Sequence, residues 1–172
     1  LINGNEIITV PPHKIARHCV GYCPEERAIF ASLSAEENLT LPPIIASGGM
    51  SVDELYAMFP NLSERRNSPG GKLSGGEQQM LAMARILRTG AKLLLLDEIT
   101  EGLAPVIVKK LGEVITELKK RGFTIILVEQ NFRFAAPLAD RHYVLEHGEI
   151  IATITQDELP GKMDWLHHRL GV

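Results

Sequence analysis

Two short segments of the chain are apolar on both faces. Residues 92–96 lead into Asp97, and residues 124–128 lead into Glu129. Short apolar runs without polar alternation are typical of buried parallel strands. Between them, residues 105–121 carry apolar positions at helical spacing, and Gly122 follows as a stop. The pattern predicts a strand–helix–strand unit of an α/β fold.

The stretch that precedes this unit is typical of helices. Three serines are each followed by a glutamate three residues later, the arrangement of a capping box at a helix start. The pairs are Ser34 with Glu37, Ser51 with Glu54, and Ser74 with Glu77. After the unit, residues 143–145 and 149–154 predict a hairpin around His147-Gly148, and residues 157–170 predict a closing helix.

Composition narrows the class of protein. A length of 172 residues fits about one domain. With 18 basic and 21 acidic residues the net charge is −3, which argues against nucleic-acid binding through charge. Cys19 and Cys23 are too few for a disulfide framework or a metal site. The chain starts at Leu1 and opens as though within a structure, so we expect a fragment or a chain that has lost its start.

Two groups of residues are candidates for chemistry. Ser74-Gly75-Gly76 opens a helix, whose free N–H groups and dipole favour a phosphate group; an ordinary capped helix is the alternative. Asp97 and Glu98 follow a buried strand, at the edge of the sheet where α/β proteins bind ligands. There Asp97 would hold Mg²⁺ and Glu98 would activate water; a strand that simply ends in polar residues is the alternative.

Five ordered motifs together resemble the ATP-binding cassette (ABC) ATPases. Residues 21–25 resemble the Q-loop, 73–79 the signature sequence, 93–98 the Walker B strand, 100–105 the D-loop and 129–131 the switch. A narrower resemblance is to the ATPases of branched-chain amino-acid importers, in which Glu25 replaces the usual Gln and Gln130 replaces the usual His. Urea-importer ATPases look similar.

The resemblance implies a fold and an organisation. The fold is α/β, a P-loop NTPase-type core with a parallel sheet plus an α-helical subdomain, truncated at its N-terminus. Residues 1–172 would form one partial ABC ATPase domain. Within it, residues 26–90 would be the helical insert with the signature, 91–155 the core strand–helix–strand unit and hairpin, and 156–172 the C-terminal helix.

The resemblance also implies roles for single residues. Ser74, Gly75, Gly76 and Glu77 would contact the γ-phosphate side of ATP held by a second ATPase subunit in a head-to-tail dimer. Asp97 and Glu25 would hold Mg²⁺. Glu98 would be the catalytic base, and Gln130 would sense the γ-phosphate.

The implied activity is ATP hydrolysis that drives a membrane importer. Membrane permease subunits would be partners, with one permease helix in a groove near Arg27 and Phe30. Nucleic acid would not be a partner. The location would be peripheral, on the cytoplasmic face of the inner membrane.

One motif of the family is absent from the sequence. No G-x-x-x-x-G-K-[ST] phosphate loop occurs in residues 1–172. We therefore expect this chain alone neither to bind ATP tightly nor to hydrolyse it, and we expect an unpaired sheet edge beside the strand at residues 93–97. The alternatives are a non-catalytic cassette that acts as a binding module, and a soluble cassette ATPase of DNA repair or translation.

Overall fold

A three-stranded parallel sheet organises the first part of the chain. It consists of β1 (Val20–Cys23), β2 (Leu93–Asp97) and β3 (Thr124–Val128), with β2 in the middle. The computed structural model describes residues 1–2 and 4–170, which divide into two compact units, Leu1–Gln130 and Asn131–Val172. The sheet belongs to the first unit.

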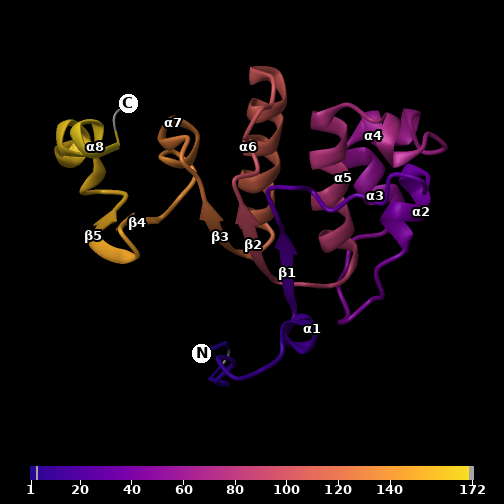
Figure 1. Cartoon of the computed structure of the whole chain (residues 1–172), viewed down its shortest axis with the longest axis horizontal. Helices are drawn as coiled ribbons and strands as arrows, with labels where there is room; N and C mark the ends of the chain where they lie inside the picture. Colours follow the sequence, from indigo (N-terminus) through magenta and orange to yellow (C-terminus); the bar gives the residue numbers. More distant parts are fainter. Residues whose placement is uncertain (3, 171–172) are drawn as a thin grey trace. The chain divides into compact units, whose positions relative to one another are not determined.

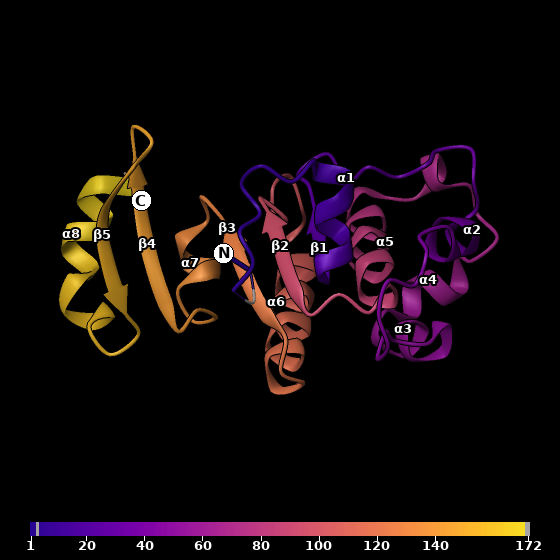
Figure 2. The ribbon, with the colours of Figure 1, turned by 90° about the horizontal axis from the view of Figure 1, so that it is seen from below.

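The predicted strand–helix–strand unit is confirmed. The chain runs from β2 through α6 (Pro105–Lys120) to β3, and β2 pairs with β3 in parallel. Figures 1 and 2 show α6 alongside β2 and β3, with α5 (Gly75–Arg88) on the β1 side. Leu94 and Leu96 of β2 are almost fully buried, and so are Leu111 and Leu118 of α6. The apolar stripe of α6 and one face of the sheet therefore form one core.

Two expectations about the sheet are wrong. The first placed an unpaired edge beside β2, but β2 pairs with β1 on one side and with β3 on the other, so among the described residues the open edges of this sheet lie at β1 and β3. The second expected both strands to be buried on both faces. Ile126 and Val128 of β3 are each 53% exposed, because among the described residues α5 and α6 cover only the opposite face of the sheet.

A helical layer precedes α5 in the sequence. Its helices are α2 (Ala35–Thr40), α3 (Val52–Met58) and α4 (Pro60–Glu64), followed by the short helix η2 (Gly70–Lys72). All three predicted capping boxes are present, at Ser34, Ser51 and Ser74. Leu55 and Phe59 are fully buried against this layer's core, together with Leu81 and Leu87 of α5.

A buried asparagine fixes the entry into this layer. Asn38 is fully buried and uses both ends of its amide. Its Oδ1 accepts from the Phe30 N–H at 2.9 Å, and its Nδ2 donates to the carbonyls of Phe30, Leu33 and Ser34 at 2.9–3.1 Å. Asn38 thus supplies the partner of the Phe30 N–H and adds a second donor to three carbonyls that also accept from backbone N–H groups.

The remaining elements are short. Before β1 lie α1 (Pro12–Ile15) and η1 (Ala16–His18), and Ile2 and Asn5 form a single antiparallel bridge. The second unit contains α7 (Phe132–Ala135), the hairpin of β4 (Arg141–Glu146) and β5 (Glu149–Thr155), η3 (Leu159–Lys162) and α8 (Met163–Leu170). The hairpin and the interrupted closing helix are as predicted. Residues 171–172 of the expected C-terminal helix lie outside the described residues.

The second unit has a core of its own. It consists of the buried side chains Phe132, Val144, Ile154, Leu159 and Leu166, against which Met163 and Trp165 pack. None of the helices in the described part of the chain is both long enough and apolar enough to cross a membrane.

Replacing Asn38 with alanine tests the anchoring of the loop. The substitution removes four hydrogen bonds from a fully buried side chain and leaves the Phe30 N–H without its partner, so the free energy of unfolding should fall by about 2 kcal/mol. Urea unfolding followed by far-ultraviolet circular dichroism measures it. Asn61→Ala, at an exposed position, is the control. Equal unfolding midpoints for the two variants would contradict the assignment.

Candidate functional site

Glu98 is the first residue beyond β2, and the structure holds it at both its backbone and its side chain. Its N–H donates to the carbonyl of Val128 at 2.9 Å, and its φ of 45° lies in the left-handed region. Its Oε1 accepts from Nε2 of Gln130 at 2.8 Å. The end of β3 therefore orients the carboxylate that follows β2.

Asp97, the last residue of β2, is paired with a tyrosine on the next strand. Oη of Tyr22 donates to Oδ2 of Asp97 at 3.1 Å. This hydrogen bond to a carboxylate is the main reason why the pKa of Tyr22 is raised. Tyr22 sits opposite Leu95 in the register, so the two side chains lie on the open face of the sheet.

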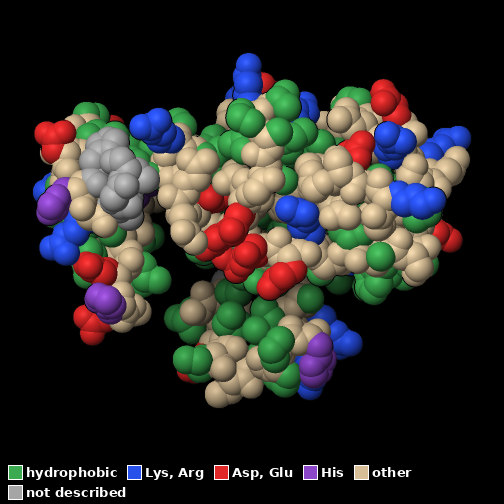
Figure 3. Space-filling view, turned by 45° about the horizontal axis from the view of Figure 1, so that its top comes forward, with side chains coloured by type: hydrophobic (Ala, Val, Ile, Leu, Met, Phe, Trp, Pro, Cys, Tyr) green, Lys and Arg blue, Asp and Glu red, His purple; other side chains and the backbone are tan. Residues whose placement is uncertain are grey.

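Three glutamates converge at this end of the sheet. Carboxylate oxygens of Glu25, Glu98 and Glu101 all lie within 4.8 Å of one another. The pKa of Glu101 is raised, chiefly by its hydrogen bond to Glu98 and then by the charge of Glu25. Figure 3 shows a gathering of acidic side chains on this face of the molecule. Several carboxylate oxygens close together suit a hard cation such as Mg²⁺.

The start of α5 presents backbone N–H groups beside a capping box. The Ser74 N–H donates to Oε2 of Glu77 at 2.8 Å, and the Glu77 N–H donates to Oγ of Ser74 at 3.3 Å. Glu77 also pairs with Arg65 at 3.7 Å. Its carboxylate therefore caps the start of the helix. No described residue accepts a hydrogen bond from the N–H groups of Gly75 and Gly76, so these groups can donate to a ligand.

Close packing requires a glycine at position 76 and crowds position 75. A Cβ on Gly76 would lie 2.8 Å from a side-chain carbon of Ile107 on α6. A Cβ on Gly75 would lie 3.2 Å from Nη1 of Arg27, which also approaches Oε1 of Gln78 at 3.4 Å. The sequence of the helix start thus allows α6 and the loop after β1 to approach it.

The structure groups the predicted site residues in two places. Glu25, Glu98 and Gln130 meet at the carboxyl ends of the strands, beside Asp97, whose carboxylate contacts Tyr22. Ser74, Gly75, Gly76 and Glu77 form the start of α5.

The contacts of Tyr22 and Glu101 were not predicted. A local indication existed for Glu101, which follows Glu98 by three residues in a turn closed by a bond from the Glu101 N–H to the Glu98 carbonyl at 3.2 Å.

Comparison with known proteins places these motifs in a family. The family described as "ABC transporter" matches residues 1–101, more than half of the chain. The chain belongs to the ABC transporter family.

Curated ABC proteins match most of the chain. BraG of Pseudomonas aeruginosa, a high-affinity branched-chain amino acid transport ATP-binding protein, is 43% identical over 86% of this chain and 65% of BraG. LivF of Archaeoglobus fulgidus, a probable branched-chain amino acid transport ATP-binding protein, is 38% identical over 92% of this chain and 69% of LivF. LptB of Haemophilus influenzae, the ATP-binding protein of a lipopolysaccharide export system, is 34% identical. The match covers 92% of this chain and 68% of LptB. The chain thus spans about two thirds of the length of these relatives.

Solved ABC cassettes share the fold. A dimeric post-hydrolysis structure of the cassette MJ0796 bound to ADP and Pi superposes with a TM-score of 0.76, over 90% of this chain and 72% of that one, at 23% identity. The ADP conformation of the cassette MJ1267 superposes with a TM-score of 0.71, over 89% of this chain and 67% of that one, at 21% identity. The expected α/β fold of an ABC ATPase, with a parallel sheet and helices, is confirmed.

Gly76→Ala tests the packing at the signature helix. The new methyl group meets Ile107, so the free energy of unfolding should fall by about 2 kcal/mol. Ile107→Ala in the same chain makes room for the methyl group, and the two changes should be non-additive in a double-mutant cycle. Gly161→Ala is the control, since nothing lies within 4 Å of its Cβ position. Strictly additive effects would contradict the proposed contact.

Proposed function

We propose that the chain is a major part of the ATP-hydrolysing subunit of a membrane importer for branched-chain or related amino acids. The observation that carries the proposal is the carboxylate of Glu98, held by Gln130 at the carboxyl end of β2 beside Asp97. The similarity to BraG and LivF supports the substrate class. The similarity to LptB is lower, at 34% identity, so an exporter is the less supported assignment.

Glu98 has the position and surroundings of a general base. A general base must face the proton that it removes, so its carboxylate has to be oriented before the substrate arrives. Gln130 provides that orientation through its 2.8 Å bond to Oε1, and we place a water molecule beside the same carboxylate, which also shares a hydrogen bond with Glu101. In the proposed reaction Glu98 takes the proton of this water as it attacks the γ-phosphate. We propose that the Gln130 amide exchanges Glu98 for a phosphate oxygen when ATP is bound.

The donor set at the sheet end fits Mg²⁺. Asp97 and Glu25 offer carboxylate oxygens, the ligand type that Mg²⁺ prefers, while the oxygens that lie within 4.8 Å of one another belong to Glu25, Glu98 and Glu101. When bound, the ion would neutralise charge on the phosphate groups. Tyr22 donates to Asp97 at 3.1 Å, and this bond keeps the carboxylate on the open face of the sheet. The convergence of Glu25 with Glu98 and Glu101 adds like charges that a cation would relieve.

The start of α5 fits the phosphate group of a nucleotide held by a second subunit. A fourteen-residue helix directs its dipole and the N–H groups of Gly75 and Gly76 toward such an anion. Ser74 adds a hydroxyl group, and Glu77 keeps the helix start in shape through the capping box. We place this element on the partner's ATP in a head-to-tail dimer of ATPase subunits.

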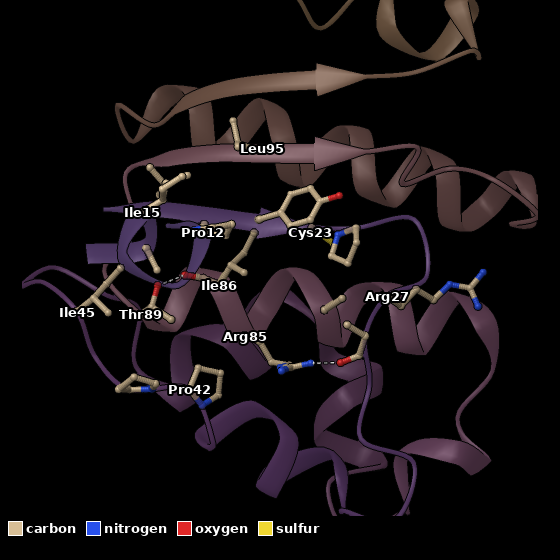
Figure 4. A pocket seen from close by; sticks show the side chains of 18 residues that line it. Pro12, Ile15, Cys23, Arg27, Pro42, Ile45, Arg85, Ile86, Thr89 and Leu95 are labelled. Atoms are coloured by element: carbon tan, nitrogen blue, oxygen red, sulfur yellow. Dashed lines mark hydrogen bonds between the residues drawn. The ribbon is translucent and has the colours of Figure 1, made fainter. Parts of the chain in front are cut away.

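An apolar cavity beside β1 fits a permease helix. It has a volume of about 560 Å³ and is lined mainly by apolar side chains from α1, β1, α5 and residues 42–45. Figure 4 shows Ile15, Pro42, Ile86 and Leu95 around it. Arg85 crosses its lower side and donates to the carbonyl of Ala28 at 2.6 Å. We assign the cavity to an apolar helix of the permease, which would hold the subunit at the cytoplasmic face of the membrane.

A second candidate is a non-catalytic binding module, which would use only the N–H groups at the start of α5. Such a module would lend Ser74 to an intact partner, and it would not need a base or a metal site. The retained Asp97, Glu98 and Gln130 favour the ATPase.

ATP titration of the 172-residue chain tests the contribution of the phosphate loop. The loop supplies the backbone cradle and lysine for the β- and γ-phosphates. Without it, isothermal titration calorimetry should detect no saturable binding of Mg·ATP tighter than about 1 mM. Micromolar affinity would contradict the expectation and would show that the described residues form a nucleotide site on their own.

Glu98→Gln tests the base in a chimaera that places the phosphate-loop segment of BraG before Leu1. The chimaera should hydrolyse ATP, and loss of the base should lower kcat by about 100-fold or more with little change in KM. The control is Glu113→Gln, an exposed glutamate on α6. An inactive chimaera would favour the binding module, and an active Glu98→Gln variant would exclude Glu98 as the base.

A further inference from the structure

Glu129, which lies between β3 and the switch residue Gln130, binds the turn that follows Glu98. Its Oε1 accepts from the N–H of Thr100 at 3.0 Å, and its Oε2 accepts from Oγ1 of Thr100 at 2.9 Å. Thr100 is only 7% exposed. Both oxygens of one carboxylate therefore hold one residue, and hydrogen bonds to a charged acceptor are stronger than neutral ones.

The segment held in this way has an unfavourable backbone conformation. Glu98 has a φ of 45°, which a residue with a Cβ adopts at a cost of about 1–2 kcal/mol. The next residue, Ile99, is 1% exposed and so anchors the turn in the core. A strained residue persists only where its surroundings fix it on both sides. On one side the Glu98 N–H is fixed to the Val128 carbonyl at 2.9 Å, and on the other side Thr100 is fixed to Glu129.

Three consecutive residues, the last of β3 and the two that follow it, thus each hold a different part of the turn at residues 98–100. Val128 holds the backbone of Glu98, Glu129 holds Thr100, and Gln130 holds the Glu98 carboxylate at 2.8 Å. The contact of Glu129 is made to a residue 29 positions earlier in the sequence, so it is no part of a local turn.

We propose that Glu129 is a positioning residue: by binding Thr100 it keeps Glu98 in its left-handed conformation and its carboxylate within reach of Gln130. The proposal depends on the proposed function in one respect only, the role of Glu98 as the base. The geometry itself is tested without nucleotide, so failure of this inference is distinguishable from failure of the proposed ATPase.

The chain contains a matched control for this contact. Glu54 accepts from the N–H of Ser51 at 2.8 Å and from its Oγ at 2.9 Å, both at Oε2, in an exposed capping box on α3. Glu54→Gln therefore also changes a carboxylate that accepts from an N–H and a hydroxyl group of one residue, and it leaves the end of β3 unchanged. Any general loss of stability from such a change should appear in both variants.

The experiment is nuclear magnetic resonance of the full 172-residue chain. It records the amide hydrogen exchange of Glu98 and Thr100 and the side-chain Nε2 proton shifts of Gln130. In Glu129→Gln, exchange at both amides should accelerate by about tenfold or more, and the Gln130 side-chain shifts should move toward those of a free glutamine. Glu54→Gln should change neither.

Variants of Thr100 complete the test. Thr100→Ser keeps both the N–H and the hydroxyl group, so its Gln130 shifts should equal those of the unaltered chain. Thr100→Val keeps only the N–H and should give an intermediate shift, and it reports on the contact even if Glu129→Gln does not fold. Unaltered Gln130 shifts in both Glu129→Gln and Thr100→Val would overturn the proposal, and so would equal effects of Glu54→Gln.

Discussion

The parallel pairing of β2 with β1 and β3 is the constraint on which the site depends. Its register places Cys23, Leu96 and Leu127 in one row across the sheet, so the residues that follow these positions leave the sheet at the same edge. Glu25, Glu98 and Gln130 are such residues. Leu94 and Leu96 fix the register, because burial of each contributes about 2 kcal/mol and a slip by one residue would turn both to the open face.

Several carboxylates lie at the same edge of the sheet, and three of them accept hydrogen bonds from neighbouring side chains. Gln130 donates to Glu98, Tyr22 donates to Asp97, and Thr100 donates to Glu129. Glu25 and Glu101 share the space around Glu98, and the raised pKa of Glu101 reflects that crowding. An arrangement of this kind suits the divalent cation that we propose for this site.

Local patterns in the sequence predicted local structure. The capping boxes at Ser34, Ser51 and Ser74 depend on residues three positions apart, and all were predicted. The helix α6 and its two flanking strands follow from periodicity. The central place of β2 and the exposed face of β3 were not predicted, because periodicity does not report which helices cover a sheet.

Contacts between distant parts of the sequence were the hardest to predict. The bond between Tyr22 and Asp97 joins positions 75 apart, and the bond between Thr100 and Glu129 joins positions 29 apart. Both depend on register and on the course of a turn. The resemblance at residues 129–131 predicts a switch position there, but it does not predict that Glu129 accepts hydrogen bonds from Thr100.

The central claim is that the carboxyl ends of these strands form one divalent-cation site beside the base. The most direct measurement is a titration of the 172-residue chain with Mn²⁺, followed by paramagnetic broadening of the backbone amide signals. We predict that broadening at low Mn²⁺ is concentrated at Glu25 and at residues 97–101. Broadening that is equally strong at the capping glutamates Glu37 and Glu54 would show non-specific attraction to acidic surface groups, and would contradict the claim.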